Sequence, residues 1–410
     1  MTVAKPLSNP NLLNTAVIIA ALGYFVDIYD LVLFSIVRVQ SLKSLGFSGE
    51  ELTSKGILLI DMQMLGMLVG GILWGVLGDK KGRLSVLFGS ILTYSLANIA
   101  NGFVDNITSY AVWRFIAGIG LAGELGAGIT LVAEVLPKEK RGYGTMIVAV
   151  IGLLGAVVAG FLHNYFDWRV CYFVGGGLGL SLLLLRIGMA ESGMFAETQE
   201  KGVARGNFFA LFTKKSRLIK YLRCIFIGLT TWYVIGILVT FSPEFAKSMG
   251  VVGEVSAGTA IMFAYGGLVV GDLLSGLLSQ ILKSRIKVMF IFLTANIVAV
   301  SFFLSASGVT ANTLYWLCGF LGVAAGFWVI FVTIAAEQFG TNLRATVTTT
   351  VPNFVRGALV PLTVLFQWLN SSYGVLNAAI YVGLFTIVVA FISLWGLKET
   401  FHEDLNYQED

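Results

Sequence analysis

Long apolar segments separated by short polar stretches recur along all 410 residues of the chain. A helix crosses the roughly 30 Å hydrocarbon core of a bilayer with about 20 mostly apolar residues, and the recurring segments have about this length. The pattern therefore predicts an all-α integral membrane protein with twelve transmembrane helices. The predicted spans lie near residues 15–40, 54–78, 84–104, 109–135, 143–164, 168–190, 221–246, 255–282, 287–307, 312–337, 346–370 and 374–397.

The composition supports the same conclusion, because 57% of the residues are hydrophobic and only 12% are charged. A soluble globular domain carries about 25% charged residues. A chain of this size cannot hide so much apolar surface from water, so lipid is the expected solvent for most of it. We expect membrane lipid as a partner, and no nucleic acid.

The sequence carries no motif for catalysis or for metal binding. The cysteines Cys171, Cys224 and Cys318 lie in or beside apolar segments without paired or metal-ligand spacing, so we expect free, buried thiols. Zinc-ligand spacing, a nucleotide-binding loop and a Ser/His/Asp arrangement are also missing. The sequence therefore predicts that the protein is not an enzyme, and neither a metal site nor a cofactor is expected.

The loops between the predicted spans alternate between basic and nearly neutral. Short loops rich in Lys and Arg stay on the cytoplasmic side of a membrane. The basic loops here follow spans of even number, which predicts that both termini are cytoplasmic and that the protein lies in the inner or plasma membrane. The basic residues that fix this orientation are Lys80, Lys81, Arg83, Lys138, Lys140, Arg141, Lys201, Arg205, Lys214, Lys215, Arg217, Lys283, Arg285, Lys287 and Arg344.

An internal repeat divides the chain into two parts. Glu134 precedes Arg141 by the interval that separates Glu337 from Arg344. Two six-helix halves related by a parallel repeat are the architecture of a large class of transporters. We predict an N-terminal half at 1–190, a cytoplasmic linker at 191–219 and a C-terminal half at 220–410.

The loop after the second span reads GVLGDKKGR from Gly75 to Arg83. Its glycines permit a tight turn and close helix packing. Asp79 can accept hydrogen bonds from the amides of a neighbouring helix N-terminus, and Arg83 can pair with Glu134 or with Asp79. We interpret the loop as a latch that holds the cytoplasmic side shut, the alternative being a plain basic turn. The predicted latch consists of Gly75, Asp79, Gly82, Arg83, Glu134 and Arg141.

This loop resembles the G-x-L-x-D-x-x-G-R sequence between the second and third helices of the major facilitator superfamily. The resemblance implies the fold of that superfamily, with twelve transmembrane helices in two six-helix halves. A weaker copy of the loop runs from Gly276 to Arg285. It has Gln280 at the position of the acid, so we expect a degraded latch in the second half.

The fourth span narrows the resemblance. Residues Arg114 to Glu124 read RFIAGIGLAGE, which resembles the fourth helix of metabolite:proton symporters, and phosphate:proton symporters carry a related pattern. Arg186 and the Glu191-Ser192 pair resemble a region of metabolite symporters and sugar porters. This resemblance covers nearly all of the first half and implies proton-coupled transport of a small molecule.

The first span contains two carboxylates, Asp27 and Asp30, three residues apart on adjoining faces of one helix. An ionised acid inside the membrane is costly, so it faces water or takes up a proton readily, as a coupling site requires. The F-x-D-x-Y-D pattern resembles the first helix of phosphate and sugar:proton symporters, which implies that Asp27 accepts the coupling proton. The alternative is that one or both acids pair with Arg114.

Glu124 is expected near the middle of the fourth span, and hence near a central cavity. It can bind substrate, carry a proton or neutralise Arg114, and the sequence leaves these roles open. The candidates for proton coupling are therefore Asp27, Asp30 and Glu124. Asp61, near the outer end of the second span, is at most a gate residue.

Arg356 lies in the eleventh span between Pro352 and Pro361. Prolines free backbone carbonyls, which a membrane helix tolerates where a cavity supplies partners. The planar guanidinium suits a carboxylate or a phosphate, so we favour anion binding over a structural pair with Asp272. Nearby aromatic rings can supply a stacking surface or serve only packing. The predicted substrate-binding residues are Arg356, Asn353, Trp232, Tyr233, Trp328 and Glu124, and the predicted structural charges are Arg114 and Asp272.

The leading hypothesis is a monomeric secondary transporter that takes up a small organic anion with a proton by alternating access. A first alternative is an efflux antiporter, but the segment Gly152 to Gly160 lacks the proline typical of the fifth span in such antiporters. A second alternative is a transport-inactive sensor or scaffold, which would be expected to add a soluble domain longer than any polar segment here. Sodium remains open as the coupling ion.

Overall fold

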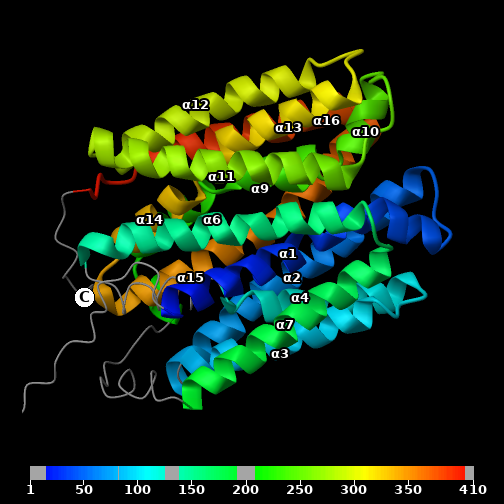
Figure 1. Cartoon of the computed structure of the whole chain (residues 1–410). Coiled ribbons are helices and arrows are strands. Elements are labelled where there is room, and N and C mark those ends of the chain that lie inside the picture. The colour runs from blue at the N-terminus through cyan, green and yellow to red at the C-terminus, as the bar shows by residue number, and fades with distance from the viewer. Residues whose placement is uncertain (1–14, 82, 125–137, 192–207, 402–410) are drawn as a thin grey trace, which may run out of the picture.

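The computed structural model describes residues 15–81, 83–124, 138–191 and 208–401, almost all of them in helices (Figure 1). The first half holds α1 (Thr15–Ser44), α2 (Glu50–Lys81), α3 (Arg83–Asn101), α4 (Ile107–Leu121), α6 (Lys138–His163) and α7 (Trp168–Glu191). The second half holds η2 (Phe208–Phe212), α8 (Lys215–Phe226), α9 (Leu229–Tyr233), η3 (Val234–Val239), α10 (Ser242–Ser248), α11 (Ala257–Leu282), α12 (Arg285–Leu304), α13 (Ala311–Ala325), α14 (Trp328–Glu337), α15 (Thr341–Gly357) and α16 (Leu359–Trp395).

The helices form twelve spans, as the sequence predicts. Among the described residues, nine helical segments are long and apolar enough to cross a membrane, and Val86–Asn101 and Ile107–Leu121 are shorter apolar helices. The segment Thr346–Trp395 supplies two spans, because Gly374 adopts a φ of 78° and breaks the helix there. The prediction of an all-α membrane protein with twelve transmembrane helices is confirmed.

Three spans of the second half are built from shorter helices in series. The π-helix η3 continues α8 and α9, α13 gives way to α14 at Gly326 and Phe327, and α15 gives way to α16 at Ala358. At Ala358 the helical hydrogen bonding continues, whereas Gly326 and Phe327 have non-helical dihedral angles, so the first N–H groups of α14 lack partners in their own helix. A membrane protein tolerates such groups where neighbouring helices or a polar cavity satisfy them.

The interruption at Gly326 lies directly against α11. A Cβ atom at Gly326 would come within 2.5 Å of the Cα atom of Gly271, so the two backbones are in contact. The next residue, Asp272, is 3% exposed, and its Oδ1 atom accepts a hydrogen bond of 3.3 Å from the backbone N–H of Val329. A carboxylate at a helix N-terminus stabilises the unpaired amides there. Asp272 therefore caps α14, and Arg356 is not its partner in the described residues.

The two ends of the bundle carry different features, and we name each after a glutamate. The Glu244 end holds α10 and the turn 45–49, and lies at the right of Figure 1. The Glu337 end holds the last residue of α14 and the first residues of α12, and lies at the left.

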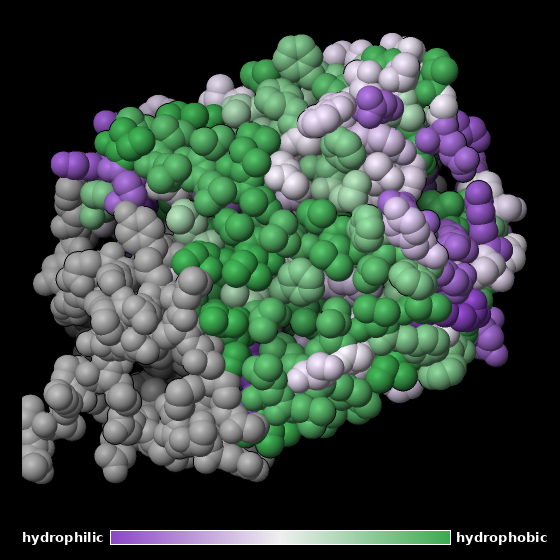
Figure 2. Space-filling view, in the orientation of Figure 1, coloured by the Kyte–Doolittle hydropathy of each residue, from purple (hydrophilic) through white to green (hydrophobic). Residues whose placement is uncertain are grey.

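A broad apolar band covers the flank of the molecule between these ends (Figure 2). Many large aliphatic and aromatic side chains are exposed on the outward faces of the helices, where a soluble protein would not present contiguous apolar surface. Lipid is the solvent for this band, and the protein is a multi-pass integral membrane protein. Representative exposed side chains are Leu65, Leu92, Leu96, Phe161, Val270, Phe302, Leu384 and Ile392.

The halves meet along helices from both parts of the chain. Helices α1 and α6 of the first half pack against α11, and α2 packs against α15 and α16. These contacts bring Asp27 of the first span to the same interface as Arg356 of the eleventh.

Candidate functional site

Asp27 of α1 and Arg356 of α15 face each other across the interface between the halves. The Oδ2 atom of Asp27 lies 4.0 Å from the Nη2 atom of Arg356, and the two side chains are 0% and 1% exposed. Within the described part of the chain, neither carboxylate oxygen of Asp27 has a hydrogen-bond partner, and the Nε and Nη1 atoms of Arg356 also lack one. The charges are therefore close enough to attract each other but leave their hydrogen-bonding capacity unused.

Aromatic side chains surround this pair. The Cζ atom of Arg356 lies 5.9 Å from the centroid of the Trp328 ring, within the range of a cation–π contact. Tyr24 and Tyr265 lie within Coulombic range of both Asp27 and Arg356. The predicted residue Trp328 is thus at the site, on the first turn of α14.

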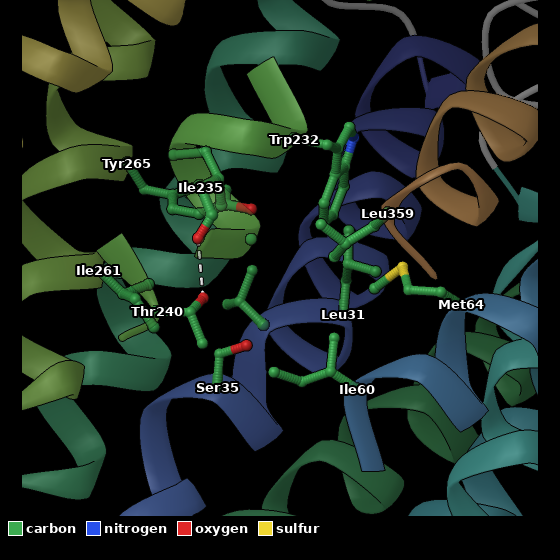
Figure 3. A pocket seen from close by; sticks show the side chains of 12 residues that line it. Leu31, Ser35, Ile60, Met64, Trp232, Ile235, Thr240, Ile261, Tyr265 and Leu359 are labelled. Atoms are coloured by element: carbon green, nitrogen blue, oxygen red, sulfur yellow. Dashed lines mark hydrogen bonds between the residues drawn. The ribbon is translucent and has the colours of Figure 1, made fainter. Parts of the chain in front are cut away.

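A pocket is lined by both halves (Figure 3). Its lining includes Leu31, four residues after Asp27 on α1, and Leu359, three residues after Arg356. The pocket is narrow in this conformation, with a cavity volume of about 10 Å³. The hydroxyl of Thr240 is engaged, since it donates a hydrogen bond of 2.7 Å to the carbonyl of Ile235. The other polar groups of the lining (Ser35, Trp232 and Tyr265) form no side-chain hydrogen bond to another described residue, so they can meet a ligand. The lining consists of Leu31, Val32, Ser35, Ile60, Met64, Trp232, Ile235, Gly236, Thr240, Ile261, Tyr265 and Leu359.

Asp30 lies in a different environment, inside the first half. It is fully buried, and neither of its carboxylate oxygens has a hydrogen-bond partner among the residues described. Arg114 lies within Coulombic range of it. The guanidinium of Arg114 donates to the side-chain carbonyl of Gln63 and lies 5.1 Å above the ring of Phe34. The two acids of the first span therefore serve separate charge centres, with Arg356 beside Asp27 and Arg114 beside Asp30.

Glu124 pairs with Arg186 of α7 and not with Arg114. One guanidinium nitrogen, Nη1, donates to Oε2 at 3.1 Å, and Nη2 donates to Oε1. The carboxylate is 2% exposed and the arginine 6%. Gly23 of α1 makes room for this pair, because a Cβ atom there would overlap both Arg186 Nη2 and Glu124 Oε1.

Two further predicted residues serve contacts between helices. The side-chain amide of Asn353 donates to the carbonyl of Ala122 at 2.9 Å, which joins the two halves close to Glu124. The hydroxyl of Tyr233 donates to the carbonyl of Ala379 at 2.8 Å, and the ring is fully buried against α16. Tyr233 is not part of the pocket lining, and we leave it out of the candidate site. Rotation of a helix about its axis decides such placements, and the sequence does not specify it.

The first predicted latch lies mostly outside the described residues, which omit Gly82 and Glu134 altogether. Gly75 and Asp79 belong to α2, Arg83 begins α3 and Arg141 belongs to α6. The side chains of Gly75, Asp79, Arg83 and Arg141 are likewise outside the described part. Their role as a latch remains a prediction.

The second copy of the loop retains an ion pair despite Gln280. The Nη2 atom of Arg285 lies 3.3 Å from the Oε1 atom of Glu337, and the hydroxyl of Thr400 donates to Oε2 of the same carboxylate at 2.7 Å. Glu337 is the repeat counterpart of Glu134, so this pair corresponds to the one predicted between Arg83 and Glu134. That the second latch is degraded by Gln280 stays a prediction.

One charged side chain that the sequence analysis did not single out is Arg38 of α1. It is fully buried and pairs with Glu244 of α10. Its position inside the predicted span 15–40 was the available signal, since an arginine within a membrane span needs a partner. Glu244 could not be identified as that partner, because the two residues are 206 positions apart.

Fold and site together define a class of protein: a helical membrane protein with two six-helix halves that meet at buried charges beside a pocket, as in transporters. Residues 20–361 match the Major Facilitator Superfamily, and the chain belongs to this family. It is therefore a secondary transporter of small metabolites and not an enzyme.

Relatives of this chain have names that refer to different transported compounds. A probable 4-methylmuconolactone transporter of Cupriavidus pinatubonensis is 24% identical over 92% of this chain and 87% of its own length. The sialic acid transporter NanX of Escherichia coli is 25% identical over 92% of this chain and 90% of its own. The niacin transporter NiaP of Acinetobacter baylyi is 30% identical over 38% of this chain and 36% of its own. The predicted resemblance to the metabolite symporter branch is confirmed.

The fold has a counterpart among solved structures. The proton:xylose symporter XylE, bound to 6-bromo-6-deoxy-D-glucose, superimposes with a TM-score of 0.70 and 16% sequence identity, over 95% of this chain and 97% of that one. At this identity the likeness establishes the shared fold.

Proposed function

We propose that the protein takes up a small organic anion together with a proton, by alternating access between its two halves. The observation that carries this proposal is the pair formed by Asp27 and Arg356, which lies between the halves. Among the described residues, both carboxylate oxygens of Asp27 and the Nε and Nη1 atoms of Arg356 have no hydrogen-bond partner. A buried arginine without a hydrogen-bonded partner is a site for a carboxylate.

Protonation of Asp27 would couple the two cargoes. When Asp27 is ionised, it neutralises Arg356 across 4.0 Å and competes with an anion for the guanidinium. When Asp27 is protonated, Arg356 is left as an uncompensated charge in a low-dielectric site, and a substrate carboxylate becomes its preferred partner. Proton and anion then bind as a neutral pair, and each favours the other.

The pocket favours an anion with an apolar body. Most of its lining is aliphatic or aromatic, and its polar side chains are Ser35, Trp232, Thr240 and Tyr265. A polyol would leave most of its hydroxyls without partners there, at a cost for each. Two relatives have names that fit such a cargo: a 3-(3-hydroxy-phenyl)propionate transporter and a 4-hydroxybenzoate transporter.

The remaining proposals follow the basic loops and the repeat. We place both termini and the Glu337 end in the cytoplasm, and the Glu244 end outside the inner or plasma membrane. The proposed halves are 1–190 and 220–410, although α8 already begins at Lys215, within the proposed linker 191–219. A monomer is the proposed working unit.

The test is the external pH of energy-depleted cells that express the protein while anions are added. The panel contains 4-hydroxybenzoate, 3-(3-hydroxyphenyl)propionate, niacin and sialic acid. We expect the external medium to become more alkaline when 4-hydroxybenzoate or 3-(3-hydroxyphenyl)propionate is added. This signal should be lost in Asp27→Asn and kept in Asp105→Asn. Asp105 is an exposed loop carboxylate and serves as the matched control. A membrane-inserted protein that gives no signal with any anion, and that lowers cellular accumulation instead, would contradict uptake and favour the efflux alternative.

A further inference from the structure

A second charge pair joins the halves at the Glu244 end. The Nη1 atom of Arg38 lies 2.7 Å from Oε1 of Glu244, and the Nη2 atom lies 2.8 Å from Oε2. The arginine side chain is 0% exposed and the glutamate 23%. Two parallel charge-assisted hydrogen bonds make this the strong form of an arginine–carboxylate contact.

Several other segments hold Arg38 in place. Its Nη2 atom donates to the carbonyl of Thr240 at 3.2 Å, and its Cζ atom lies 4.5 Å from the centroid of the Phe241 ring. On the side of the first half, the hydroxyl of Thr53 in α2 donates to Glu244 at 3.4 Å. Elements α1 and α2 are thus joined to the segment from Thr240 to α10, which belongs to the other half.

The pair of Arg38 and Glu244 lies between the pocket and the Glu244 end of the bundle. Ser35 lines the pocket and precedes Arg38 by three residues on α1, while Thr240 lines it and precedes Glu244 by four. One helical turn contains about 3.6 residues, so Arg38 lies about one turn from the lining along α1, toward the Glu244 end. Glu244 lies on α10, which begins two residues after Thr240. A ligand that moved between the pocket and that end would have to pass between segments that the pair holds together.

We propose that Arg38 and Glu244 form the outer gate of the transporter, and that their separation opens the pocket to the outside. This inference rests on the proposed orientation of the membrane protein. While the pair is closed, Arg38 has a half-buried carboxylate partner and the pocket is shut. When the halves move apart at this end, water replaces the carboxylate around the guanidinium. The strength of the pair therefore sets the fraction of molecules that are open to the outside.

The experiment measures access to the pocket from outside with a reporter cysteine at Ser35. A membrane-impermeant maleimide is added to intact cells that carry Ser35→Cys, and the labelling rate is followed. The three native cysteines are buried, and the chain without Ser35→Cys gives the background. No substrate and no pH gradient are present, so the result does not depend on which cargo is transported or on proton coupling.

The gate predicts faster labelling when the pair is weakened. Glu244→Gln keeps the shape of the side chain and removes its charge. It should raise the labelling rate about tenfold, which corresponds to the lower end of the coupling energies of close charge pairs. Glu51→Gln, at an exposed carboxylate of the same end, should leave the rate unchanged. Arg38→Glu should also raise the rate, and the double exchange Arg38→Glu with Glu244→Arg should return it toward that of the unmodified pair.

Two results would overturn the proposal. An unchanged labelling rate in Glu244→Gln, at normal abundance in the membrane, would show that the pair does not control access. Faster labelling in inside-out vesicles alone would place the pair on the cytoplasmic side and so refute an outer gate. Failure of proton-coupled uptake with a normal labelling response would leave the gate standing and reject only the proposed cargo.

Discussion

At the scale of single residues, the protein places opposite charges in pairs and uses the pairs differently. Glu124 and Arg186 are joined by two hydrogen bonds and are nearly inaccessible. Asp27 and Arg356 are equally buried but make no hydrogen bond to each other at 4.0 Å. Separating Glu124 from Arg186 would break satisfied hydrogen bonds. In the looser pair, Asp27 can take up a proton and Arg356 can bind an anion instead.

The first prediction concerns the geometry of anion binding. Arg356→Lys keeps the positive charge but loses the planar pair of donors that a carboxylate requires. We expect the KM for the transported anion to rise about tenfold, as for the loss of one charge-assisted hydrogen bond, with the protein still present in the membrane. Arg169→Lys, near the Glu244 end and away from the pocket, is the control. A KM equal to that of the native protein would argue against a carboxylate on Arg356.

A second prediction concerns the space that Gly23 leaves. Gly23→Ala would push a methyl group into both Glu124 and Arg186, and overpacking of a tight interior costs about 1–3 kcal/mol. Gly177→Ala is a matched control, because nothing lies within 4 Å of its added Cβ atom. Thermal unfolding of the purified proteins in detergent should show a lower Tm for Gly23→Ala alone. Equal Tm values for the two variants would mean that the pair can shift without cost.

At the scale of elements, carboxylates from other segments of the chain stabilise the N-termini of two helices, α14 and α12. The start of α14 is capped by Asp272, and the start of α12 is capped by Glu399. The carboxylate of Glu399 accepts hydrogen bonds from the hydroxyl of Ser284 and from the backbone N–H groups of Arg285 and Ile286. The N-terminus of a helix stabilises a negative charge, so both carboxylates hold chain segments together.

The third prediction is a pH dependence at this second cap. Partial burial alone would raise the pKa of Glu399, but the hydrogen bonds from Ser284 and from backbone amides outweigh it, so its pKa lies below the usual value. The cap therefore stabilises the fold above the pKa of an unfolded glutamate, about 4.3, and this contribution is lost as the pH falls through the folded pKa.

Thermal unfolding in detergent at several pH values measures the effect. Glu399→Gln should lower the Tm by about 2 °C at pH 7, and the difference from the native protein should shrink as the medium is acidified below pH 4. Glu254→Gln, at an exposed carboxylate of the opposite end, should change neither value. A difference that grew on acidification would contradict the assigned sign.

The sequence specified the elements more fully than the contacts between them. Hydropathy located the twelve spans, since the requirement to cross the bilayer acts on each segment alone. Hydropathy does not reveal the interruption at Gly326 or the cap by Asp272, because both depend on how closely α11 approaches α13. The pairing of Glu124 with Arg186 and of Arg38 with Glu244 also depends on the rotation of distant helices. A charged residue within a span indicates that it has a partner, but the sequence does not identify that partner.

At the scale of the whole molecule, charges in the interface between the halves lie at two depths. Asp27 and Arg356 lie beside the pocket, and Arg38 and Glu244 lie between the pocket and one end of the bundle. Movement of one half against the other would alter both pairs at once. Cargo binding at the first pair and opening at the second are therefore coupled through the same rigid helix, α1, which carries Asp27 and Arg38.

The most direct test of the account is whether Asp27 links the proton to the anion. The purified protein is placed in liposomes, and accumulation of the transported anion is driven by an imposed pH gradient with no membrane potential. The native protein should accumulate the anion. Asp27→Asn should exchange the anion across the membrane but fail to accumulate it, because Arg356 is then free for the anion without a proton. Accumulation by Asp27→Asn in response to the pH gradient would contradict the account.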